Sequence, residues 1–111
     1  MSNHVHVIDI EKIEKIEIIS EDSINKLSTL FKMFSDPTRL KILNVLLYKE
    51  LNVCEISELV KMSHSAVSHQ LSTLKLSNLV KSRKKGKQVY YALSDDHISS
   101  IIALGLEHIG E

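Results

Sequence analysis

The 111-residue chain has 43% apolar and 25% charged residues and a formal net charge of zero, which fits one globular domain. No apolar run approaches the roughly 20 residues of a membrane-spanning helix, and the first residues lack the basic-then-apolar pattern of a secretory signal. A single cysteine, Cys54, excludes an internal disulfide and fits a reducing compartment. We therefore expect a cytoplasmic protein with no membrane partner.

Charged residues are strongly segregated along the chain. Residues 9–22 carry six acidic side chains and only two lysines. Residues 59–94 carry no acidic side chain, and their basic residues are Lys61, Lys75, Lys81, Arg83, Lys84, Lys85 and Lys87. A local basic surface of this kind attracts a polyanion such as DNA, although a solvated basic face is the alternative.

The first 20 residues are ambiguous. Residues 4–9 could extend as a strand, whereas the residues after them favour a helix through the pair Glu11–Lys15 at i,i+4. We expect residues 1–20 to form a partly flexible segment or a dimer-associated helix. We expect residues 21–111 to form the folded domain.

Two helices are predicted next. From Asp22 onward, apolar residues share one helical face: Ile24, Leu27, Leu30, Phe31 and Phe34. A second helix begins with Asp36 as its N-cap and Pro37 at the first helical position. Its apolar positions suit a buried element: Leu40, Ile42, Leu43, Leu46 and Leu47.

Two further helices are separated by only about three residues. Asn52 and Glu55 form a capping-box pattern at the start of the first, which lies in the segment LNVCEISELVKMS, residues 51–63. Ser63 caps the second, residues 64–77. The short link between the two is typical of a helix-turn-helix.

Residues 79–93 follow as two strands around Gly86, which predicts a hairpin with its tip at Lys84–Lys87. The last helix begins near Ser94 or Asp95. We therefore predict a mostly α protein with a β-hairpin wing, a winged helix-turn-helix.

The helix at residues 64–77 displays polar side chains on the side away from its leucines: Ser65, Ser68, His69 and Gln70. Hydroxyl, amide and imidazole groups reach phosphates and base edges in a major groove, although an ordinary polar helix face is the alternative. His64 and His69 are five residues apart, which disfavours a metal site there. Lysines at the wing tip would add salt-dependent affinity for the DNA backbone: Lys84, Lys85 and Lys87.

Four segments resemble the ArsR/SmtB family of metal-sensing repressors: DPTRLKIL, ELNVCEI, SHSAVSHQLSTLKLSNLV and GKQVYYAL. The resemblance extends from about Ser28 to Glu111. It implies a homodimer that binds a partly palindromic operator in double-stranded DNA and represses genes for handling metals. It also implies that residues 64–77 form the recognition helix, with DNA contacts at His64, Ser65, Ser68 and His69.

The end of the chain carries two carboxylate–histidine pairs, Asp95 with His97 and His108 with Glu111. The two histidines are 11 residues apart, about 16 Å along a helix, so one ion cannot bind both. His108 and Glu111 are neighbours at i,i+3, whereas Asp95 reaches His97 only from a non-helical start. Two antiparallel copies of the helix would combine the pairs into two sites, each with two nitrogen and two oxygen ligands for tetrahedral zinc.

The same D-x-H and H-x-x-E pattern occurs in the family's zinc-sensing subgroup. This resemblance implies that the second ring nitrogen of His97 bonds a backbone carbonyl near the recognition helix. Four protein ligands leave no open position for a small-molecule substrate, so we expect a regulator and not an enzyme. Zinc is the expected metal, and cobalt or nickel is the alternative, particularly if His4 and His6 join the site.

A second family site uses a Cys-x-Cys motif, which reads here Asn52-Val53-Cys54. Loss of the first thiolate argues against a soft-metal site, and we expect Cys54 to be a buried small apolar residue. The other hypotheses are a winged-helix regulator without metal sensing, a zinc-dependent hydrolase, and a zinc-linked dimerisation module without DNA binding. The basic wing argues against the last of these.

Overall fold

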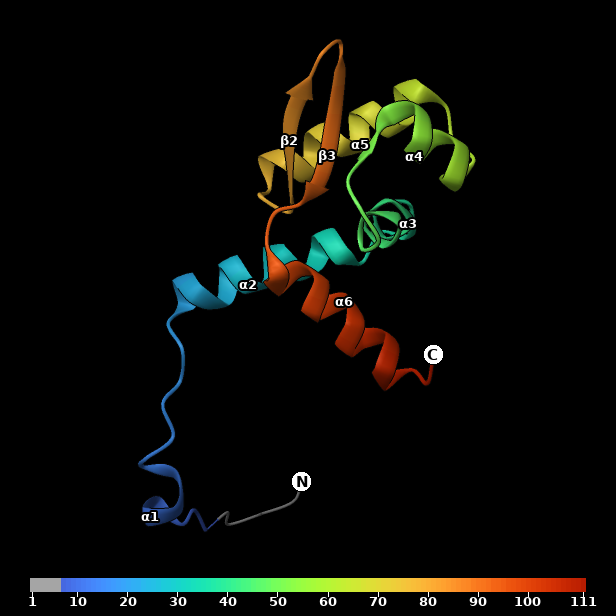
Figure 1. The fold of residues 1–111 in the computed structure, drawn as a ribbon. Helices are drawn as coiled ribbons and strands as arrows, with labels where there is room; N and C mark the ends of the chain where they lie inside the picture. The colour runs from blue at the N-terminus through green and yellow to red at the C-terminus, as the bar shows by residue number, and fades with distance from the viewer. Residues whose placement is uncertain (1–6) are drawn as a thin grey trace, which may run out of the picture.

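The helices of the domain begin at polar caps, as the local sequence predicts. The computed structural model, shown in Figure 1, describes residues 7–111, so His4 and His6 lie outside the described residues. N-cap side chains accept backbone hydrogen bonds at Ser20, Asp36, Asn52, Ser63 and Asp95. They start α2 (Glu21–Phe34), α3 (Pro37–Leu46), α4 (Val53–Val60), α5 (His64–Leu76) and α6 (Asp96–His108). The predicted capping box at Asn52 is present.

One apolar core joins α3, α4 and α5 to the start of β2 (Val80–Lys85). Its fully buried side chains are Ile42, Leu43, Ile56, Val67, Leu71, Leu74 and Leu79. Leu40 was predicted to belong to this core, and that prediction is wrong: its side chain is 38% exposed. It lines a groove beside α6 instead.

A tight turn connects α4 to α5. Lys61 ends α4 in the left-handed conformation, with φ 58°, and the Met62 N–H donates to the Ser57 carbonyl. Ser63 then caps α5 directly. The chain therefore reverses within three residues, and α4 packs against α5, which confirms the predicted helix-turn-helix.

The wing belongs to a three-stranded antiparallel sheet. β2 and β3 (Gln88–Leu93) form the predicted hairpin, with Gly86 at φ 63° in its turn. The short strand β1 (Leu51–Asn52) pairs with the other edge of β3, which gives the order β1-β3-β2. β1 was not predicted from the sequence. The fold class, mostly α with a β-hairpin wing, is confirmed.

Both ends of the described chain project from the domain (Figure 1). We call residues 7–20 the arm; it contains α1 (Ile10–Ile13) and lies away from the other helices, and the longest dimension of the molecule is 68 Å. Residues 7–9 do not form the strand that was considered for this segment. The wing projects from the opposite side of the domain from the arm, and α6 extends away from the sheet toward its C-terminal end.

Apolar side chains stay exposed on α2 and α6. The predicted apolar face of α2 is present, but among its residues only Phe34 is buried, while Phe31 is 51% exposed. Leu104 on α6 and Ile109 directly after it are exposed in the same way. None of the helices within residues 7–111 has the length and apolar character needed to span a bilayer.

Candidate DNA-binding surface and metal-ligand residues

The outward side of α5 is polar over most of its length because Val67, Leu71 and Leu74 turn inward, and only Leu76 at its end is exposed. Val67, Leu71 and Leu74 are fully buried. On the other side, the predicted DNA-contacting residues lie at exposed or partly exposed positions: His64, Ser65, Ser68, His69 and Gln70. Their shared exposure on one helix makes α5 accessible to a groove of DNA, and their contact with bases stays a prediction.

The predicted wing-tip lysines lie at exposed positions on either side of the Gly86 turn: Lys84, Lys85 and Lys87. The base of the wing is tied to α5, because Lys75 Nζ donates a hydrogen bond of 2.7 Å to Ser82 Oγ. The wing and the C-terminal end of α5 are therefore linked by side chains as well as by the chain itself.

Arg83 differs from the other basic residues of the wing because it is paired. Its Nε lies 2.9 Å from both carboxylate oxygens of Glu50, and its Nη2 also donates to Glu50 Oε1. This side-chain hydrogen bond lowers the pKa of Glu50 and raises the pKa of Arg83. Sequence reasoning did not identify Glu50, because the two residues are 33 positions apart and no local pattern links them.

Asp95 lies just outside α6 in an extended conformation, with φ −162°. Its Oδ1 accepts hydrogen bonds from the backbone N–H groups of His97, at 2.9 Å, and Ile98, at 3.3 Å. The same oxygen is 3.3 Å from His97 Nδ1. The non-helical start that the Asp95–His97 pair requires is therefore present, and the two side chains lie side by side.

The second pair has a different geometry from the one expected. α6 ends at His108, and Gly110 adopts φ 86°, so Glu111 lies beyond the regular helix. The Glu111 N–H donates to the Leu106 carbonyl at 3.0 Å, which fixes the last residue against the helix end. The expectation that a regular helix carries both His108 and Glu111 is therefore wrong, because the helix ends at His108. Both side chains are exposed.

The residues present fit a zinc ion in their chemistry. Zinc accepts both imidazole nitrogens and carboxylate oxygens as ligands, and all four side chains are solvent-exposed. Both backbone bonds to Asp95 end on Oδ1, so Oδ2 is available to an ion. Within residues 7–111 of one chain, however, no group of three or more His, Cys, Asp or Glu side chains lies close enough to hold a metal.

Of the predictions for Cys54 and for the His97 imidazole, the first is wrong and the second stays a prediction. Cys54 was predicted to be buried, and this is wrong: it is exposed in the first turn of α4, while Ile56 and Ser57 occupy the buried side of that helix. A hydrogen bond from the imidazole of His97 to a backbone carbonyl near α5 is not among those of the described residues, so it stays a prediction.

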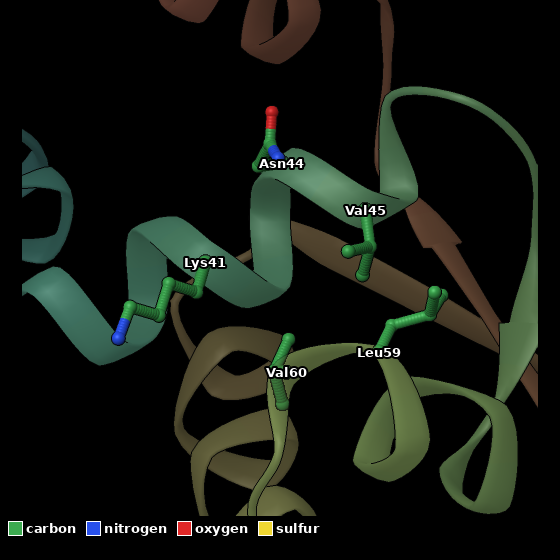
Figure 2. Close-up of a pocket in the computed structure, with 5 residues that line it drawn as sticks. All are labelled: Lys41, Asn44, Val45, Leu59 and Val60. Carbon is green, nitrogen blue, oxygen red and sulfur yellow. The ribbon is translucent and has the colours of Figure 1, made fainter.

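An open hollow of about 290 Å³ lies between α3 and α4 (Figure 2). Val45, Leu59 and Val60 face its interior, whereas the ends of the Lys41 and Asn44 side chains point away from them. No carboxylate, imidazole or thiol lines this hollow. It therefore offers neither an acid–base pair nor metal ligands.

These features define a winged-helix regulator, and comparisons with known proteins agree. Residues 36–82 match the family described as "Bacterial regulatory protein, arsR family". The chain is 36% identical over 107 residues to a "Transcriptional repressor SmtB homolog" from Synechocystis, covering 96% of this chain and 80% of that protein. It is 35% identical to a "Cadmium resistance transcriptional regulatory protein CadC homolog" from Staphylococcus aureus, covering 85% of this chain and 88% of that one.

A solved structure extends the comparison to the fold. The homodimeric winged helix-turn-helix DNA-binding domain of a possible ArsR-family regulator from Mycobacterium bovis has a TM-score of 0.74 and 25% identity, covering 79% of this chain and 82% of that one. The chain therefore belongs to the ArsR/SmtB family of metal-sensing repressors. It is a DNA-binding transcriptional regulator and not an enzyme.

Proposed function

We propose that this chain is a homodimeric repressor that binds operator DNA and releases it when zinc binds between the subunits. The proposal rests on one observation: four exposed side chains that can bind a metal ion lie at the two ends of α6. They are, in chain order, Asp95, His97, His108 and Glu111. The histidines are about 16 Å apart along the helix axis. One ion cannot bind both pairs of the same chain, so a complete site requires a second copy.

An apolar groove supports the dimer. It has a volume of about 290 Å³ and is lined by Phe34, Leu40, Ile101, Ile102, Gly105, Leu106 and Ile109. An apolar surface of this kind, next to the exposed Leu104, favours association with another protein surface. Two antiparallel α6 helices would place Asp95 and His97 of one subunit beside His108 and Glu111 of the other. Two-fold symmetry then gives two equal sites.

The polar side of α5 and the lysines of the wing support DNA as the partner. In a winged helix-turn-helix, the second helix of the motif enters the major groove, where hydroxyl and imidazole groups reach base edges. Ser65, Ser68 and His69 lie on the part of α5 that would enter first. The wing-tip lysines would contact phosphates and make binding depend on salt.

The proposed switch is a coupling between zinc binding at α6 and DNA binding at α5 and the wing. Bound zinc would link the subunits through two nitrogen and two oxygen ligands. Asp95 follows closely on Leu93, the last residue of β3, so a change in how the α6 helices pack would move the wing and α5. If the DNA-free arrangement holds zinc more tightly, the same coupling free energy weakens DNA binding, typically by about 1–3 kcal/mol.

Zinc titration of a protein–DNA complex tests the proposal. The probe is a labelled duplex of the DNA immediately upstream of the chain's own gene. Fluorescence anisotropy of the label measures how much of the duplex is bound. We expect wild type to release the duplex on adding zinc. His97→Ala should bind DNA as well as wild type but retain it in zinc, and the adjacent carboxylate variant Asp96→Asn should behave like wild type. Release by His97→Ala would show that these residues are not the sensor.

Substitution with Co²⁺ distinguishes the alternative metals. A tetrahedral four-ligand site gives intense visible absorption, whereas a six-coordinate site suited to nickel or cobalt absorbs weakly. An intense spectrum supports zinc. A weak spectrum supports the nickel or cobalt alternative, and absence of binding supports a winged-helix regulator without metal sensing.

A further inference from the structure

A side-chain contact between residues far apart in sequence joins Glu50 to Arg83 of the wing. Arg83 Nε lies 2.9 Å from both oxygens of the Glu50 carboxylate, and Nη2 donates to one of them, so the contact is a multidentate ion pair. Glu50 is 31% exposed and Arg83 is 55% exposed. The geometry is that of a fork on a carboxylate, which restrains direction as well as distance.

This ion pair spans the sheet. Glu50 directly precedes β1, Arg83 lies in β2, and both strands pair with β3 between them. Arg83 is opposite Tyr90 in the β2–β3 register, and its guanidinium lies 5.8 Å from the centre of the Tyr90 ring. The pair therefore ties the outer strand of the wing to the segment between α3 and β1.

The base of the wing is held at a second point. Lys75 of α5 donates a hydrogen bond to Ser82, the residue before Arg83, at 2.7 Å. Successive residues of a strand point to opposite faces, so Ser82 and Arg83 are held on the two faces of the sheet. Lys84, the first lysine of the tip, follows immediately. Lys75 and Arg83 are therefore both engaged within the protein.

We propose that Glu50 is a positioning residue for DNA binding: through Arg83 it fixes the direction of the wing so that the tip lysines reach the phosphate backbone. This role rests on the proposed DNA-binding function. It predicts a change in DNA affinity opposite to the change expected from charge alone. Removing a carboxylate near a DNA-binding surface would normally raise affinity for a polyanion, whereas loss of a positioning residue lowers it.

The test compares Glu50→Gln with Glu58→Gln, which also removes one carboxylate but from an exposed i,i+3 pair with Lys61 on α4. The probe is a labelled duplex of about 30 base pairs from the DNA upstream of the gene, enough for two half-sites. We expect Glu50→Gln to bind about 3- to 10-fold more weakly, with a salt slope smaller by about one. Glu58→Gln should bind as tightly as wild type or more tightly. Equal or tighter binding by Glu50→Gln overturns the positioning role.

A second comparison asks whether Glu50 acts through the wing. In a variant with Lys84, Lys85 and Lys87 all changed to Ala, the additional Glu50→Gln change should have no further effect. A loss of the same size in that background overturns the proposal.

The outcomes separate this role from the proposed function. If wild type binds no duplex, the DNA-binding function is wrong and the role of Glu50 fails with it. If wild type binds and Glu50→Gln binds as tightly or more tightly, only the positioning role is wrong.

Discussion

Asp95 combines two tasks in one side chain. Its Oδ1 caps α6 through the N–H groups of His97 and Ile98, and its position beside the His97 imidazole makes it a candidate metal ligand. An asparagine keeps the capping oxygen but loses the negative charge, whereas an alanine loses both. The two tasks can therefore be separated by mutation.

We expect Asp95→Asn to leave thermal stability almost unchanged and to weaken zinc binding by about 10-fold or more, because the anionic ligand is lost. Asp95→Ala should weaken zinc binding similarly and also lower the free energy of unfolding by about 1 kcal/mol through the missing cap. Thermal unfolding without metal and competition with a zinc chelator measure the two effects. A large loss of stability in Asp95→Asn would contradict this division.

At the scale of elements, α5 has one face that packs in the core and another that is exposed. Leu71 on the inner face is fully buried in the core shared with α3 and α4, whereas Leu76 at the end of the helix is 86% exposed. The inner face sets where the helix lies, and the outer face is what DNA would meet. Substitutions on the two faces should therefore affect different measurements.

We expect Leu71→Ala to lower the free energy of unfolding by about 2–5 kcal/mol, because it leaves a cavity in the packed core. The matched change Leu76→Ala should cost less than about 0.5 kcal/mol, because that side chain lies at the surface. Urea denaturation followed by circular dichroism measures both. Similar losses for the two variants would mean that Leu76 is covered in solution.

At the scale of the whole molecule, the exposed apolar groove should decide whether a metal site can form. Leu106 lines this groove on α6 and is 37% exposed. In Leu106→Arg, an unpaired charge would have to be buried in the interface, which is strongly unfavourable. We expect this variant to sediment as a monomer and to bind zinc at least about 10-fold more weakly, since each chain then holds half of a site.

Tyr48→Arg is the matched control, because Tyr48 is 81% exposed and lies outside the groove. It should remain dimeric and bind zinc like wild type, as measured by sedimentation velocity and chelator competition. A dimeric Leu106→Arg would place the interface elsewhere on the molecule.

Local signals allowed much of the fold to be predicted from the sequence. The caps at Asp36, Asn52 and Ser63 mark helix starts correctly, because each cap bonds a backbone group only three residues away. The strand β1 was missed because its formation depends on pairing with Tyr91, 40 positions along the chain. The exposure of Cys54 was missed because which side of α4 faces the core is decided by packing and not by residue type.

For the candidate metal site too, local features could be predicted from the sequence, whereas those that depend on the folded backbone could not. Spacing alone identified both carboxylate–histidine pairs, and the extended conformation of Asp95 satisfies the local condition for the first pair. The geometry of the second pair depends on Gly110, whose positive φ turns Glu111 off the helix. The link between Glu50 and Arg83 left no trace in either local sequence, since it exists only after the sheet has formed.

The separation of charge in space has a consequence for how the protein meets DNA. The formal charges cancel, yet the acidic arm and the basic wing project on opposite sides of the domain (Figure 1). The negative potential of a duplex attracts the basic wing and repels the acidic arm, so an approaching chain turns with its wing toward the phosphates. Because the Debye length is about 8 Å at physiological ionic strength, this rotation acts only during the last stage of approach.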